Sequence, residues 1–158
     1  MKSQPRMNRE RAKELLGELD LLIQRGQPPA ALRKSVVQML NLEPTYSWVG
    51  LYLVKGEDLR LDCWSGPAPT THPSIPLGKG ICGFAAKSGR TEIVSDVSKD
   101  PRYLQCFAST RSEIVVPVFH DGKVVAEIDI DGDLTNAHSS IDREFLEALA
   151  ARISRFCA

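Results

Sequence analysis

Two stretches of the chain decide the fold: Gly78-Lys79-Gly80-Ile81-Cys82-Gly83 and Ser112-Glu113-Ile114-Val115-Val116-Pro117. The glycines of the first allow a tight turn that exposes backbone amides at the start of a short helix. The second is an apolar strand with an acid near its start, and Cys106 precedes it, 24 positions after Cys82 (106 − 82). An acid-bearing strand, Glu127-Ile128-Asp129-Ile130-Asp131, follows. Thiols close to fixed carboxylates suit a site that recognises an amine and performs sulfur redox chemistry.

Length and composition limit the class of protein. The 158 residues fit one domain with a core of its own. Twenty basic and twenty acidic residues give a net charge of zero, and no Lys/Arg stripe is interleaved with aromatics, which argues against nucleic acid as a partner. The N-terminus has no apolar core and no apolar run reaches the length of a membrane span, so we expect no signal peptide and no membrane. A cytoplasmic, reducing location follows, in which the cysteines are thiols or redox centres.

The sequence argues against a structural metal site and indicates no cofactor. No Cys-x-x-Cys pair is present, and the three histidines lie in turn-like segments. A structural zinc site normally needs such closely spaced ligand pairs. We therefore expect no metal.

The hydrophobic pattern predicts a mixed fold. Residues 1–7 are expected to be disordered, and apolar residues recur at helical spacing from Asn8 and again from Pro29. Two antiparallel strand pairs should follow, the second turning at Asp121-Gly122, and a helix capped by Ser139 or Ser140 closes the chain. The strands are expected at residues 46–54, 59–64, 91–94, 113–119 and 123–131. The prediction is one α+β domain over residues 8–158, with a largely antiparallel sheet and helices packed on it.

Cys82 and Cys106 are the candidate reactive thiols. Cys82 should lie at a helix N-terminus with Lys79 beside it, and both features lower the pKa of a thiol. The alternative is that Cys82 is a small core hydrophobe. Cys106 lies in irregular chain, where functional residues concentrate, although an incidental loop thiol fits as well. Cys63 and Cys157 are interpreted as packing or incidental residues.

Glu127, Asp129 and Asp131 should share one face of their strand, because side chains alternate along a strand. Such a face is usually solvated. If the long loops at residues 65–76 and 95–110 cover it, it becomes a wall suited to an ammonium group. A two-residue turn at Asp121-Gly122 would place Glu113 opposite Ile130, on the other face. A three-residue loop with a bulge would place Glu113 opposite Asp129, and we expect this second register.

Trp48 and Tyr52 are four positions apart, so both should point to the same side of the first strand. Aromatic residues at such positions commonly belong to the core. On the acid face they would instead form the apolar wall of a small pocket and hold a thioether or S-methyl group.

Across roughly residues 40–135 the chain resembles the free methionine-R-sulfoxide reductases, which are built on the GAF domain. The resemblance rests on residues 48–52, 75–83 and 112–117 together with Cys106 and Asp129-Ile130-Asp131. It implies a six-stranded antiparallel sheet with helices on both faces, and often a homodimer through the terminal helices. It implies that Cys106 attacks the sulfoxide and that a second cysteine and thioredoxin recycle it. It also implies roles in substrate binding: the ammonium would be held by Glu113, Asp129 and Asp131, and the methyl end by Trp48 and Tyr52.

Two positions depart from the pattern of that family. His72 stands where a third, resolving cysteine is usual, and Phe107 stands where an aspartate usually follows the nucleophile. Cys82, or an external thiol, would then have to resolve the oxidised Cys106. Two other interpretations stay open: a non-catalytic GAF module that binds a small metabolite, and a redox sensor that forms a Cys82–Cys106 disulfide without substrate.

Overall fold

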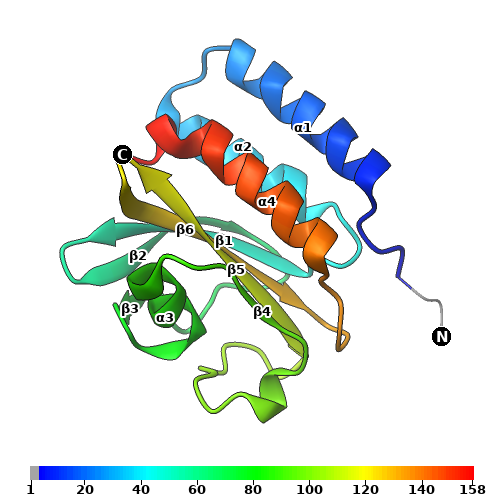
Figure 1. Cartoon of the computed structure of the whole chain (residues 1–158), viewed down its shortest axis with the longest axis vertical. Coiled ribbons are helices and arrows are strands. Elements are labelled where there is room, and N and C mark those ends of the chain that lie inside the picture. The colour runs from blue at the N-terminus through cyan, green and yellow to red at the C-terminus, as the bar shows by residue number, and fades with distance from the viewer. Residues whose placement is uncertain (1–3) are drawn as a thin grey trace.

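The computed structural model describes residues 4–158 and contains four α-helices and six strands (Figure 1). Two short 3-10 turns, Val97–Lys99 and Ser154–Phe156, complete the chain. The helices are α1 (Arg9–Gln24), α2 (Pro29–Asn41), α3 (Gly80–Ser88) and α4 (Ser140–Ile153). The strands are β1 (Trp48–Lys55), β2 (Asp58–Ser65), β3 (Ser74–Pro76), β4 (Glu92–Val94), β5 (Ser112–His120) and β6 (Lys123–Gly132).

The strands form one sheet in the order β3-β2-β1-β6-β5-β4, and every neighbouring pair is antiparallel. Helices α1, α2 and α4 lie on one side of this sheet, and the short α3 lies on the other (Figure 1). The α+β architecture predicted from the sequence, with helices on both faces, is confirmed. None of the helices in residues 4–158 combines the length and apolar character needed to cross a membrane.

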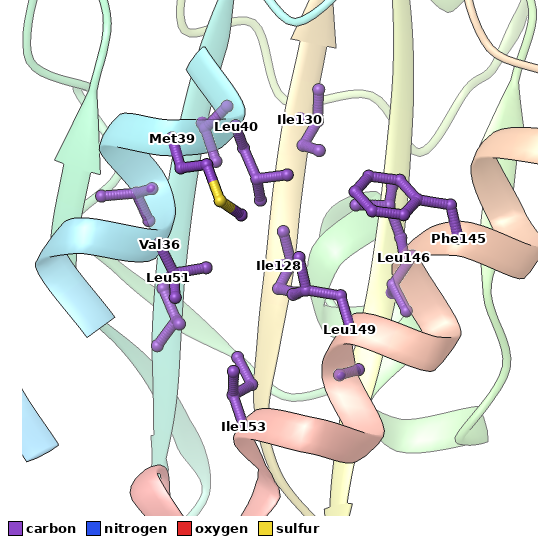
Figure 2. Packing of buried hydrophobic residues seen from close by; sticks show 14 of the residues in the cluster. Val36, Met39, Leu40, Leu51, Ile128, Ile130, Phe145, Leu146, Leu149 and Ile153 are labelled. Carbon is purple, nitrogen blue, oxygen red and sulfur yellow. The ribbon is translucent and has the colours of Figure 1, made fainter. Parts of the chain in front are cut away.

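The larger core lies between the sheet and helices α2 and α4. Figure 2 shows side chains of both helices meeting those of the central strands β1 and β6. These residues are Val36, Met39, Leu40, Leu51, Ile128, Ile130, Phe145, Leu146, Leu149 and Ile153. Each fully buried aliphatic side chain contributes roughly 1.5–3 kcal/mol to stability. The helical spacing of these apolar residues gives α2 and α4 one apolar face each. Packing of those faces on the sheet accounts for the positions of both helices.

The other face of the sheet packs against α3 and the long loops, and it carries a mixed layer. Apolar members such as Ile81 and Ala85 of α3 are buried there beside Trp48 and Tyr52 of β1. Side chains alternate along β6, so Ile128 and Ile130 enter the larger core while the acids between them enter this second layer. The sheet therefore separates an apolar core from a buried acidic layer.

The register of the β5–β6 hairpin differs from the expected one. Asp121 and Gly122 have φ angles of 50° and 77°, which makes a two-residue type I′ turn with His120 paired to Lys123. The expected three-residue loop is therefore wrong, and so is the pairing of Glu113 with Asp129. Farther from the turn, the register shifts by one residue between Val118 and Phe119, so that Glu113 pairs with Asp131. This bulge adds one residue to β6 and so returns Glu113 to the acid face.

The chain before α1 packs against the domain from residue 4 onward. Residues 1–7 were expected to be disordered, and residues 1–3 lie outside the described part. Met7 is buried in the larger core, and Gln4 Nε2 donates a hydrogen bond to Asp133 at 2.9 Å. Asn8 caps α1 through a 2.8 Å bond from Arg11 N to Asn8 Oδ1. The long loop after β2 also contains a strand that the pattern did not predict, β3.

A buried bond ties the start of α4 to the segment before β1. Tyr46 donates its hydroxyl to Asp142 Oδ1 at 2.5 Å, and the other carboxylate oxygen of Asp142 accepts from Ser139 N at 2.8 Å, within a capping box. We predict that Tyr46→Phe lowers the free energy of unfolding by roughly 1.5–3 kcal/mol, the range for hydrogen bonds to charged groups. Urea denaturation followed by circular dichroism measures this loss. An unchanged midpoint would contradict the assigned contribution of the bond.

Candidate functional site

Cys82 lies in the first turn of α3, on its buried side. Gly83 allows this placement, because a Cβ at this position would lie 2.5 Å from the carbonyl oxygen of Pro76 at the end of β3. The helix can therefore approach β3 closely, and Cys82, 6% exposed, faces the acid layer of the sheet.

Four carboxylates are buried on the face of β5 and β6 that Cys82 meets. Glu127 is fully buried, and Glu113, Asp129 and Asp131 are each at most 6% exposed. No ion pair within residues 4–158 involves any of them. Thr110 Oγ1 donates a 3.4 Å hydrogen bond to Asp131 Oδ2. These four carboxylates thus offer many hydrogen-bond acceptors, and little in the protein compensates their negative charge. A cation would complement such an environment.

Burial governs the protonation of this layer. It raises the pKa of Glu113, Glu127, Asp129 and Asp131, and the charge of Asp129 raises that of the other three further. Burial and the nearby acids also raise the pKa of the Cys82 thiol. This direction is opposite to the one expected from its place at a helix N-terminus, because desolvation of the thiolate outweighs the helix dipole.

Cys106 lies in the segment between β4 and β5 and is held by the loop after β2. Thr70 Oγ1 donates to Cys106 Sγ at 3.1 Å and accepts from His72 N at 3.0 Å. Tyr52 donates its hydroxyl to His72 O at 3.0 Å, and His72 Nε2 lies 3.3 Å from Gln105 O. The two long loops are therefore joined to each other and to β1 around the sulfur.

A small cavity connects these groups. Its volume is about 20 Å³, and it is lined by Tyr52, His72, Ile75, Gly80, Ile81, Cys82, Leu104, Cys106, Glu113 and Asp129. The cavity brings together five of the seven residues singled out from the sequence. The other two, Trp48 and Asp131, lie in the same layer of the fold without lining it.

The Trp48 indole is engaged by its own neighbours. It stacks on Trp64 with 6.4 Å between ring centroids and meets Phe107 in a tilted contact at 5.8 Å. Its Nε1 donates to Ala68 O at 3.0 Å. In this closed arrangement Trp48 supports the loops, and Tyr52 is the aromatic residue that reaches the cavity.

Cys106 is half-buried, and its pKa is raised to about 11. Burial is the largest cause, and the charges of Asp129 and Asp131 act in the same direction. The hydrogen bond from Thr70 opposes them, because it stabilises the thiolate. Thr70 was not singled out from the sequence, where only the length of its loop indicated function.

The fold and the comparison with known families identify the class of protein. The GAF domain family model matches residues 30–155, and the chain belongs to the GAF domain family.

Within this family the chain is related to the free methionine-R-sulfoxide reductases. It is 39% identical over 121 residues to the Saccharomyces cerevisiae enzyme of that name, covering 74% of this chain and 66% of the yeast protein. The solved structure of the Staphylococcus aureus free methionine-R-sulfoxide reductase in complex with its substrate has a TM-score of 0.87 and 32% identity. It covers 99% of this chain and 100% of that chain. The type II enzyme from Thermoplasma acidophilum has a TM-score of 0.79 and 36% identity, covering 82% of this chain and 92% of that chain.

Because its pKa is raised, the thiol of Cys106 should be mostly protonated at neutral pH. Alkylation of Cys106 by iodoacetamide is expected to rise about tenfold per pH unit across the neutral range, because the thiolate is the reacting form. Thr70→Val should slow the reaction at fixed pH roughly threefold to tenfold by removing a hydrogen bond to the charged sulfur. Peptide mass spectrometry of Cys106 measures both effects. Thr70→Ser keeps the hydroxyl and should react like the wild type. Equal rates in Thr70→Val and Thr70→Ser would contradict the role of this bond.

Proposed function

We propose that this protein reduces free L-methionine-R-sulfoxide to methionine. The observation that carries the proposal is that the thiols of Cys82 and Cys106 line the same cavity as Glu113 and Asp129. The relation to reductases of this name, one of them solved with its substrate, supports it.

The acid wall accounts for the preference for a free amino acid. An ammonium group has three donors and a full charge, and the buried carboxylates on β5 and β6 offer acceptors that no cation of residues 4–158 pairs with. Glu113, Asp129 and Asp131 are assigned to this group. A methionine sulfoxide within a polypeptide has no free ammonium at this position and should be excluded.

The chemistry assigns one role to each sulfur. The Cys106 thiolate attacks the sulfoxide sulfur, a protonated carboxyl group donates to the departing oxygen, and methionine leaves with Cys106 as a sulfenic acid. Cys82 then condenses with the sulfenic acid, forming a disulfide and releasing water. A dithiol reductant, for which thioredoxin is the expected partner, transfers two electrons to the disulfide. The raised pKa values of Glu113 and Asp131 favour the protonated form that this first step needs.

Substrate entry requires the loops to open. Sites that enclose small molecules commonly have about 300–1,000 Å³, and the cavity here has about 20 Å³. The loop bearing Thr70 and His72 closes over Cys106 through a few hydrogen bonds, which makes it the element best suited to move. In the proposed function the described structure is the closed form of the site.

The proposal predicts epimer-selective turnover. With dithiothreitol or thioredoxin, the wild type should consume free methionine-R-sulfoxide and leave the S-epimer. Cys106→Ser should lower kcat by about 10³-fold or more, because the nucleophile forms the covalent intermediate. Chiral chromatography of the remaining sulfoxide measures both. Cys63→Ser is the matched control, since Cys63 lies on the helix-covered face, and it should retain wild-type turnover. Retained activity in Cys106→Ser would remove the assigned nucleophile.

Oxidation by substrate should link the two cavity cysteines. One equivalent of the R-sulfoxide, without reductant, is expected to give a Cys82–Cys106 disulfide detectable by peptide mapping. Cys82→Ser should release one equivalent of methionine and stop at a sulfenic acid that dimedone traps. A disulfide between Cys106 and another cysteine would contradict the assignment of Cys82. Homodimer formation stays a prediction of the resemblance.

The second candidate function is a sensor, and the raised pKa of Cys106 and the small cavity favour it. Binding of methionine sulfoxide without turnover in dithiothreitol would select this function. A peroxide-induced disulfide in ligand-free protein would select the redox-sensor version.

A further inference from the structure

Cys82, Glu113 and Asp129 together form a cluster of potential metal ligands, and the binding of an ammonium group does not require all three. Cys82 Sγ and one carboxylate oxygen each from Glu113 and Asp129 all lie within 4.8 Å of one another. A thiol is a weak hydrogen-bond acceptor and adds little to the binding of an ammonium. A borderline-soft divalent cation uses a thiolate and carboxylates together.

One of these cavity-lining carboxylates has an oxygen without a hydrogen-bond partner. Asp129 is 6% exposed and lines the cavity, and its Oδ1 has no hydrogen-bond partner among residues 4–158. Both oxygens of Glu127, which is fully buried in the same layer, are also without a partner in that part of the chain. An unsatisfied buried carboxylate oxygen costs free energy that a ligand would recover.

The size of the cavity selects an ion over a larger ligand. A volume of about 20 Å³ holds one water-sized body, for which roughly 10–15 Å³ is the minimum. Bond lengths of about 2.0–2.3 Å place two ligands of a tetrahedral zinc ion roughly 3.5 Å apart. The three ligand atoms therefore need to approach one another by no more than about 1.5 Å, a side-chain adjustment.

We propose that a thiophilic divalent cation, with Zn²⁺ as the representative, binds to Cys82, Glu113 and Asp129 in the closed cavity. Three protein ligands leave one coordination position of the ion open, and the thiol proton of Cys82 goes to solvent on binding. Mg²⁺ and Ca²⁺ are excluded, because they need six or more oxygen ligands and do not select sulfur. This consequence rests on the proposed function: the cation uses the carboxylates assigned to the substrate ammonium, so the two exclude each other and the metal-bound protein is inhibited.

The sequence argued against a metal because its cysteines and histidines show no close spacing. The proposed ligands come instead from α3, β5 and β6, far apart in the chain. The tertiary fold alone brings them together.

The test uses the purified full-length chain, stripped of metal and kept reduced. Titration with Co²⁺ should give one equivalent bound with a sulfur-to-cobalt charge-transfer band, and Zn²⁺ should displace it while excess Mg²⁺ does not. Cys82→Ser should remove the band and weaken Zn²⁺ binding about 100-fold or more, since even outer-shell partners of a metal are worth 10–100-fold. Cys63→Ser and Cys106→Ser are the matched thiol controls and should keep the band. Asp129→Asn should weaken binding with the band retained at saturation.

Several outcomes would overturn the proposal: no charge-transfer band, binding unchanged in Cys82→Ser, or a band lost in Cys63→Ser or Cys106→Ser. Thermal unfolding of each variant separates loss of a ligand from loss of the fold, and Asp129→Asn provides the second test if Cys82→Ser does not fold. Reductase activity is measured separately with a chelator present. Failure of the activity therefore leaves the metal result standing, and failure of metal binding leaves the activity standing.

Discussion

The structure depends on one unfavourable arrangement: four carboxylates buried on one face of β5 and β6 with no cation of residues 4–158 paired to them. Desolvation raises the pKa of each of the four carboxyl groups. A fold gains no stability from such a layer. In the proposed function the ammonium group of the substrate supplies the positive charge that this layer lacks, and in the proposed metal site the cation does. The redox-sensor alternative makes no use of the layer.

The rest of the domain compensates for this layer. The opposite face of the same strands carries Ile128 and Ile130, which pack beneath α2 and α4 in an apolar core (Figure 2). Because side chains alternate along β6, one face of the strand contributes apolar residues to the stabilising core and the other carries the acids of the candidate site. The placement of three helices on the apolar face and one short helix on the acid face follows (Figure 1). The thin cover of α3 and two loops gives access to the acids without opening the larger core.

The sequence predicted the parts of this arrangement that depend on periodicity. Alternation placed Asp129 and Asp131 on one face, and helical spacing placed the larger core. The register of Glu113 could not be predicted in the same way. Asp121-Gly122 located the turn, but the expected three-residue loop was wrong. The bulge beyond Val118 has no sequence signal of its own, and one added residue there exchanges the two faces of the strand. Two other features arise only when segments distant in sequence meet in the fold. One is the burial that raises the pKa of Cys82, and the other is the hydrogen bond from Thr70 to Cys106.

The same charges that attract a cation also control the nucleophile. Burial is the main reason for the raised pKa of Cys106, and Asp129 and Asp131 raise it further. A bound ammonium compensates these carboxylates and removes their opposition to the thiolate, while the bond from Thr70 continues to stabilise it. The sulfur is then most reactive when a positively charged ligand lies beside it and least reactive when the cavity is closed without one. In the proposed function this coupling protects the Cys106 thiol from oxidants that carry no ammonium group, because the reactive form arises together with the substrate.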